Sequence, residues 1–162
     1  MIKLFDHAVD FNTQKKMYKE LSNLTYEHGE SDYEGAKIIG LSCELNKNTL
    51  SFKILNNILK MIKELDELNL VRTYVNKFEP EDKPLFHIDS LDGGITALYY
   101  ANDKEEDIDE LGGTQFYLKD TEEIKEVLNI PGRIIIFDGG IRHRATSFRN
   151  KTRYTIAFKY EK

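Results

Sequence analysis

The chain has 162 residues, 40% hydrophobic and 31% charged, a composition typical of a globular protein of one domain. It contains no run of about 18 uncharged apolar residues, so we expect no transmembrane helix, and its charged start lacks the apolar run of a signal peptide. The net charge of −5 disfavours general binding to polyanions such as nucleic acid. Cys43 is the sole cysteine, which excludes an intrachain disulfide and favours a reducing, cytoplasmic location.

The first part of the chain carries two patterns of helical periodicity. Residues 13–24 predict a first helix with Thr13 as its N-cap, and Thr49 opens a stronger apolar stripe that predicts a second helix over 48–67. Stripes of this kind usually pack against a sheet. Residues 1–68 are therefore expected to form a helical support region.

After residue 68 the pattern changes to short strand-like runs separated by glycine-rich turn signals. The expected strands cover residues 70–78, 85–89, 95–101, 114–118, 126–130, 133–137, 142–145 and 153–160. The local pattern at 122–128 is equally compatible with a short helix. About eight strands after two helices predict a mostly β (α+β) fold, with a double-stranded β-helix (jelly-roll) core over 69–162 and N-terminal supporting helices. We expect one domain over residues 1–162.

Three side chains in the strand-rich part form a candidate metal-ligand set. His87 and Asp89 lie two residues apart on an expected strand, so their side chains should share a face, and His143 follows on a later strand. Two histidines and one carboxylate are the facial triad of non-haem Fe(II) oxygenases. Arg153, ten residues after the second histidine, suits the far carboxylate of a 2-oxo acid because a guanidinium can bind a carboxylate through two hydrogen bonds.

These residues stand in a longer series of motifs. The series reads His87-x-Asp89, 96–102 (TALYYAN), 112–116 (GGTQF), 131–133 (PGR), His143 and Arg153-x-Thr155. In this order residues 70–160 resemble the 2-oxoglutarate/Fe(II)-dependent dioxygenase superfamily, and most of all its prolyl-4-hydroxylase branch. The helical front carries no motif of its own.

The resemblance implies roles for individual residues. Fe(II) would be bound by His87, Asp89 and His143. Arg153 would bind the distal carboxylate of 2-oxoglutarate, helped by the hydroxyl of Tyr100, which strand parity favours over its neighbour Tyr99.

Two further positions of the cofactor site follow from the resemblance. Asn76 and Thr155 are the remaining candidate cofactor-binding residues, and Asn76 lies in an N-x-F segment similar to the N-x-Y segment of AlkB-like nucleic-acid dealkylases. Phe78 stands where prolyl hydroxylases usually have a tyrosine, so the contact of that hydroxyl is missing here.

The resemblance also implies an activity. A prolyl residue of a protein or peptide would be hydroxylated with O2, 2-oxoglutarate would be decarboxylated to succinate, and ascorbate is expected as a reductant. Three alternatives remain open: hydroxylation of a free amino acid or other small molecule, AlkB-like dealkylation of nucleic acid, and a non-catalytic cupin-like metal-binding module. Residues 79–84 and 102–112 are expected to close over the site, and the acidic run 103–110 is expected to be a solvated loop. Oligomeric state is not predicted.

Overall fold

The computed structural model describes residues 1–28, 39–102 and 111–162. Its helices are α1 (Phe11–Ser22), α2 (Leu50–Leu59) and the short 3-10 helix η1 (Lys63–Leu65). Its strands are β1 (Ile2–Phe5), β2 (Glu27–His28), β3 (Leu41–Glu44), β4 (Asn69–Phe78), β5 (Ile95–Tyr100), β6 (Thr114–Leu118), β7 (Glu123–Val127), β8 (Ile134–Asp138), β9 (His143–Ala145) and β10 (Arg153–Glu161).

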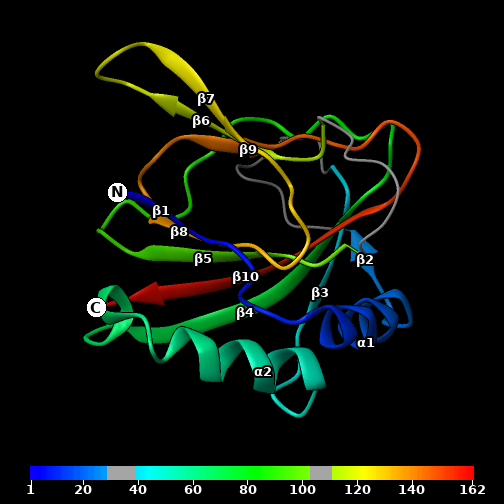
Figure 1. Cartoon of the computed structure of the whole chain (residues 1–162). Coiled ribbons are helices and arrows are strands. Elements are labelled where there is room, and N and C mark those ends of the chain that lie inside the picture. Colours follow the sequence, from blue (N-terminus) through cyan, green and yellow to red (C-terminus); the bar gives the residue numbers. More distant parts are fainter. Residues whose placement is uncertain (29–38, 103–110) are drawn as a thin grey trace.

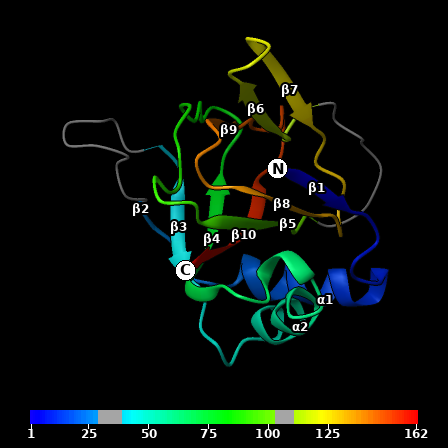
Figure 2. The same cartoon turned by 90° about the vertical axis from the view of Figure 1, so that its left-hand side faces the viewer.

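The strands form two antiparallel sheets. The larger has the order β1-β8-β5-β10-β4-β3-β2, and the smaller has the order β7-β6-β9. The smaller sheet lies over one face of the larger sheet, and α1 and α2 cover the opposite face (Figures 1 and 2). The expected mostly-β fold, with a jelly-roll core and helices supporting one sheet, is confirmed.

The larger sheet separates two apolar cores. The outer core joins helices and sheet and includes Met17, Leu21, Leu55, Val75, Ile136 and Ile156. The inner core lies between the sheets and includes Leu98, Tyr100, Phe116, Ile135, Phe137 and Ala157. Strand alternation sends successive side chains of β4, β5, β8 and β10 to these two cores in turn. The candidate site shares the inner face with the second core.

The first helix begins earlier than the sequence predicted. Asp10, and not Thr13, is the N-cap of α1, because its carboxylate accepts hydrogen bonds from the backbone N–H of Thr13 at 3.1 Å and from its hydroxyl at 2.6 Å. A carboxylate at this position also interacts favourably with the helix dipole. The predicted N-cap, Thr13, is thus the residue that donates to the true N-cap, Asp10.

The second helix is shorter than predicted. The helix opens at the predicted Asn48-Thr49 pair, and Thr49 is its N-cap, since the Thr49 hydroxyl oxygen accepts from the N–H of Phe52 at 3.3 Å. The helix ends at Leu59, however, and does not continue to residue 67. Ile62 adopts an extended conformation (φ −93°, ψ 109°) that separates α2 from η1. Ile62 and Leu65, which follow Leu59 in the apolar stripe, are still buried in the core, which is why the periodicity looked unbroken.

The strand predictions need three corrections. Residues 85–89 form no strand, and His87 makes a single isolated bridge to His143. Residues 123–127 form β7, a hairpin partner of β6, so the alternative of a helix at 122–128 is wrong and the strand begins three residues before the predicted 126. The N-terminal region, expected to be helical, also contributes β1, β2 and β3 to the larger sheet.

Two further expectations concerned a membrane-spanning helix and the acidic run. Among the described residues, no helix is long and apolar enough to cross a membrane. The acidic run 103–110, which makes up most of one expected closing segment, lies outside the described residues.

Candidate metal centre and adjoining cavity

Backbone pairing brings His87 and His143 together. Each N–H donates to the carbonyl of the other residue at 2.9 Å, and the N–H of Asp89 donates to the carbonyl of Gly139 at 2.8 Å. As a result, one ligand atom from each of His87, Asp89 and His143 lies within 4.8 Å of the others. The structure thus brings together the three residues that the sequence selected, from a loop and from β9.

The orientation of both imidazoles is set by hydrogen bonds to the backbone. The Nδ1 atoms of His87 and His143 lie 3.1 Å and 2.7 Å from the carbonyl oxygens of Leu85 and Ile141. Because a carbonyl can only accept, Nδ1 carries a proton in each ring, and in the neutral imidazole this leaves the lone pair on Nε2. These Nε2 atoms lie 3.5 Å and 3.4 Å from the carboxylate oxygens of Asp89.

Three acceptor groups therefore converge on one point, an arrangement that a cation stabilises. His143 is further held by the ring of Phe137, whose centroid is 4.6 Å away. Asp89 and His143 are buried, whereas 29% of the His87 side chain is exposed. The centre is thus enclosed on two sides and open at His87.

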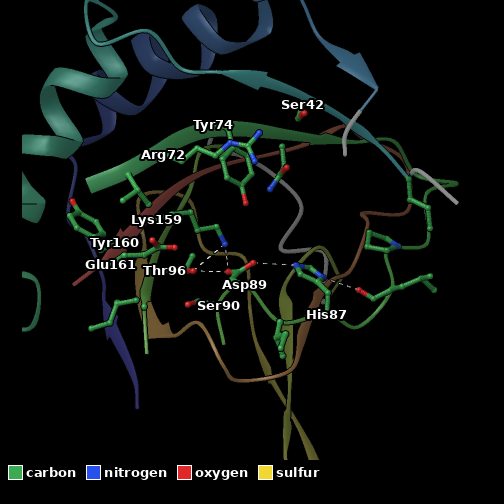
Figure 3. Close-up of a pocket in the computed structure, with 18 of the residues that line it drawn as sticks. Ser42, Arg72, Tyr74, His87, Asp89, Ser90, Thr96, Lys159, Tyr160 and Glu161 are labelled. Carbon is green, nitrogen blue, oxygen red and sulfur yellow. Dashed lines mark hydrogen bonds and ion pairs between the residues drawn. The ribbon is translucent and has the colours of Figure 1, made fainter. Parts of the chain in front are cut away.

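Asp89 receives support from two residues of the larger sheet, which Figure 3 shows beside it. The hydroxyl of Thr96 donates to Asp89 Oδ2 at 2.6 Å, and the ammonium of Lys159 pairs with the same oxygen. Burial alone would raise the pKa of Asp89, but the charge of Lys159, and hydrogen bonds from His143 and His87 when their Nε2 atoms carry a proton, outweigh burial and hold that pKa well below its usual value. Asp89 is therefore an ionised carboxylate.

A narrow cavity of about 60 Å³ runs from the three candidate metal ligands to Arg153. Arg153 begins β10, faces the inner side of the larger sheet and is almost fully buried. Its Nε donates to the carbonyl of Gly112 at 2.6 Å, and Nη2 donates to the carbonyl of Gly113 at 3.2 Å. Weaker bonds of 3.4 Å reach the hydroxyls of Thr114 and Thr155.

Within the described part of the chain, Arg153 has no carboxylate partner. Burial lowers the pKa of Arg153 to about 10, so the guanidinium is still charged at neutral pH. A buried cation without a counter-charge is costly, and an anionic ligand in the cavity would remove that cost. Arg153 therefore marks this end of the cavity as a candidate anion site.

The other predicted cofactor-binding residues occupy different places around this cavity. Asn76 and Thr155 line it and lie directly opposite each other on β4 and β10. Phe78 also lines it, with its ring 5.8 Å from the Arg153 guanidinium. Tyr100 is fully buried behind the cavity wall, where its hydroxyl lies 2.8 Å from the hydroxyl of Thr114. Its contact with a ligand stays a prediction, whereas its contact with Thr114, which also bonds to Arg153, is in place.

The expected closing segment 79–84 is a hydrogen-bonded turn beside the cavity. The N–H of Glu79 donates to the Asp82 carboxylate at 2.8 Å, and the hydroxyl of Ser147 donates to the carbonyl of Asp82 at 2.8 Å. Pro84, at the end of this turn, lines the cavity. The turn is thus tied to the chain segment that follows β9.

Sequence reasoning missed Thr96 and Lys159 as members of the site. A signal was available, because Lys159 has the same strand parity as Arg153 and Thr155 and therefore faces the same side of the sheet. The contact to Asp89 depends on the register of β10 with β5, which pairs Lys159 with Thr96. That register is not visible in the local sequence.

The fold resembles those of known oxygenases. No protein-family model matches the sequence, and no curated protein is significantly similar to it. A prolyl hydroxylase from Trichoplax adhaerens, in complex with a hypoxia inducible factor peptide fragment, superimposes with a TM-score of 0.79 and 15% identity, covering 98% of this chain and 82% of that chain. A prolyl-4-hydroxylase of Pseudomonas putida gives a TM-score of 0.74 and 12% identity, over 99% and 92% of the two chains.

A third similar protein has been solved with small molecules bound. HygX from Streptomyces hygroscopicus, solved with nickel and 2-oxoglutarate, gives a TM-score of 0.71 and 10% identity over 98% of this chain and 82% of that chain. Another structure of HygX also contains hygromycin B. At these identities the likeness establishes the fold alone, which this chain shares with the two prolyl hydroxylases and HygX.

Proposed function

We propose that this protein is an Fe(II)- and 2-oxoglutarate-dependent dioxygenase that hydroxylates a C–H bond, with a prolyl residue of a peptide or protein as the leading substrate. The observation that carries the proposal is the pairing of two features in one cavity. At one end three acceptor groups, from His87, Asp89 and His143, converge as a metal would require. At the other end the buried charge of Arg153 has no acidic partner among the described residues.

The donor set fits Fe(II). Two imidazoles that can present Nε2 to a metal, together with one ionised carboxylate, form a facial triad, which leaves further coordination positions open for a co-substrate. When bound, iron and 2-oxoglutarate supply the oxidising chemistry, in which 2-oxoglutarate and O2 become succinate and CO2 while one oxygen atom enters the substrate C–H bond.

The protein's own contribution is binding and orientation. His87, Asp89 and His143 would hold the metal, and their backbone and side-chain hydrogen bonds keep the ligand atoms aimed at one point. Arg153 would bind the distal carboxylate of 2-oxoglutarate, and Thr155 and Asn76 border the path between the two ends of the cavity. The small volume and apolar lining of this cavity exclude bulk water from the reacting centre.

The proposal of a prolyl substrate draws on the neighbouring structures and on the groove beside the metal centre. Two of the similar structures are prolyl hydroxylases, one of them with a peptide bound. An open groove of about 400 Å³ also borders His87 and Asp89, large enough for a side chain with adjoining backbone. A small-molecule substrate is the second candidate, because this groove carries several charged side chains, including Arg72, Lys159 and Glu161.

Mass spectrometry tests the proposal. The Fe(II)-loaded protein, with ascorbate and 2-oxoglutarate, is incubated with proline-containing peptides and separately with free amino acids, and both succinate and a mass gain of one oxygen atom are measured. We expect succinate in every wild-type reaction that yields an oxidised product, and none with His143→Ala. Oxidation of free amino acids without any peptide product would favour the second candidate. Complete absence of succinate would point to a non-catalytic metal-binding module.

A further inference from the structure

We infer that the groove beside the metal centre binds a carboxylate group of the primary substrate between Arg72 and Lys159. The inference rests on the proposed function, because it concerns the substrate of that same site. The groove adjoins the narrow cavity of Arg153, with which it shares His87, Asp89 and Lys159 as lining residues, and lies between β4, β10 and the loop that carries His87 (Figure 3).

Strand register places two cations side by side in this groove. Lys159 on β10 pairs directly with Arg72 on β4, so both side chains project from the same face of the larger sheet. Like charges directly opposite each other in a sheet are destabilising. The fold compensates each of them on its far side, since Arg72 bonds to the Glu44 carboxylate at 2.7 Å and Lys159 pairs with Asp89.

The result is a line of charges in the order Glu44, Arg72, Lys159, Asp89. Its two acids are at the ends, and its two cations, which both line the groove, are cross-strand neighbours in the middle. Lys159 has only 16% of its side chain exposed, and Arg72 has 38%. An anion placed between these cations would remove their mutual repulsion in a partly desolvated setting, where charge pairs are stronger than in bulk water.

Tyr74 completes the anion subsite. It lies next to both cations, with its ring 4.6 Å from the Arg72 guanidinium and 5.8 Å from the Lys159 ammonium. Both cations lie within cation–π distance of the ring, which Figure 3 shows projecting from β4 into the groove. The planar guanidinium of Arg72 matches the geometry of a carboxylate.

The charge of the rim argues for a singly charged anion. Glu161 lines the groove and Glu44 pairs with Arg72, so two acids place negative charge around the subsite. These acids would repel a phosphate dianion more strongly than a carboxylate. Because Lys159 contacts both the subsite and Asp89, a bound carboxylate would hold the neighbouring C–H bonds of the substrate close to the metal centre.

Matched acids and amides test this inference by direct binding. ¹⁵N-labelled protein is first saturated with Zn(II) and 2-oxoglutarate, a step that by itself tests the co-substrate site. It is then titrated with N-acetyl-L-proline or N-acetyl-L-prolinamide, and with the peptides acetyl-Ala-Pro-Asp-amide or acetyl-Ala-Pro-Asn-amide. These two pairs distinguish a small acid from an acidic peptide as the source of the carboxylate.

In the wild type we expect at least one acid to bind at least tenfold more tightly than its amide, a difference of about 1.4 kcal/mol. Its chemical-shift changes should centre on Arg72 and Lys159. Arg72→Gln should reduce the ratio of acid to amide affinity to near one. Glu44→Gln is the matched control, because it breaks the same ion pair but keeps the cation, and it should retain or strengthen the preference for acid.

Two results would overturn the inference: equal binding of acid and amide in both pairs, or a preference that survives Arg72→Gln. If 2-oxoglutarate fails to bind in the first step, the proposed function is in error. The acid and amide titrations still report on the groove in that case, because their readout requires no catalysis.

Discussion

His87 and His143 exchange two backbone hydrogen bonds of 2.9 Å each, and this small bridge sets the distance between their imidazoles. The rings, 4.5 Å apart between centroids, both direct Nε2 toward Asp89. The spacing of the candidate metal ligands is thus determined by main-chain pairing between two segments distant in sequence. Loss of either imidazole should leave that pairing, and hence the fold, in place.

Metal binding should therefore depend on the imidazole of His143 without affecting folding. We expect wild-type protein to bind one Fe(II), or Mn(II) as a redox-inactive substitute, and His143→Ala to lose this binding in calorimetric titrations while its circular dichroism spectrum is unchanged. His28→Ala, which removes an exposed histidine on β2, is the control and should bind as the wild type does. Wild-type metal affinity in His143→Ala would contradict the ligand assignment.

The hydroxyl of Thr96 should support the metal through Asp89. Thr96→Val keeps the shape of the side chain but removes the 2.6 Å hydrogen bond to Oδ2, and loss of such a supporting bond typically lowers metal affinity by about 10–100-fold. Mn(II) titration measures the change. Thr73→Val alters a buried threonine paired with Phe158 of β10 and should leave the affinity unchanged. Equal affinities for the two variants would mean that Asp89 is positioned by other contacts.

Gly113 should be required for the shape of the Arg153 end of the cavity. A Cβ atom at this position would lie 2.4 Å from the carbonyl oxygen of Val127, a backbone atom that cannot easily move away. We expect Gly113→Ala to destabilise the protein by about 1–3 kcal/mol in urea unfolding, as overpacked substitutions do. At Gly140 the nearest atom would be 3.6 Å away, so Gly140→Ala should be tolerated. A fully stable Gly113→Ala variant would show that β7 can move away from this strand.

The ion pair between Asp6 and Arg133 should make stability depend on acid pH. Arg133 donates to the two carboxylate oxygens at 2.5 Å and 3.0 Å, and this hydrogen bonding lowers the pKa of Asp6 below its usual value. A carboxylate with a lowered pKa in the folded state contributes stability above its unfolded pKa of about 3.9, and this contribution is lost as pH falls through the folded pKa.

Asp6→Asn should accordingly lower the free energy of unfolding at pH 7 by about 1 kcal/mol, the upper end for a partly exposed pair. Near pH 2 the variant and the wild type should converge. Urea unfolding at both pH values measures this. A difference that is constant with pH would assign the effect to packing and not to charge.

Some parts of the site could be read from the sequence, and others depend on distant pairing. Residue type and spacing along the chain were enough to identify the H-x-D pair, the second histidine and Arg153 as candidate site residues. The charge line of the groove could not be found in this way, because it arises where the registers of β3, β4, β5 and β10 coincide. For Lys159, the sequence showed that its side chain shares a face of the strand with Arg153, but it did not show that Lys159 contacts Thr96 and Asp89.

The fold shows the same division. Helical periodicity located α1 and α2, yet the ends of both were misplaced, because the carboxylate of Asp10 and the extended conformation of Ile62 decide them. Residues 85–89 alternate like a strand. Their N–H groups, however, pair with β9 only at His87 and then turn toward Gly139, whose carbonyl accepts from both Asp89 and Ser90.

The most direct test of the co-substrate site is the affinity for 2-oxoglutarate of the Mn(II)-loaded protein, measured by calorimetry in the wild type and in Arg153→Gln. We predict one bound 2-oxoglutarate per chain and at least a tenfold loss of affinity in the variant, because removing one partner of a buried charge pair costs about 2–5 kcal/mol. Tyr100→Phe should give a smaller loss, and Arg144→Gln, whose guanidinium stacks 4.5 Å from the Phe86 ring outside the cavity, should give none. Unchanged affinity in Arg153→Gln, or a loss in Arg144→Gln instead, would contradict the account.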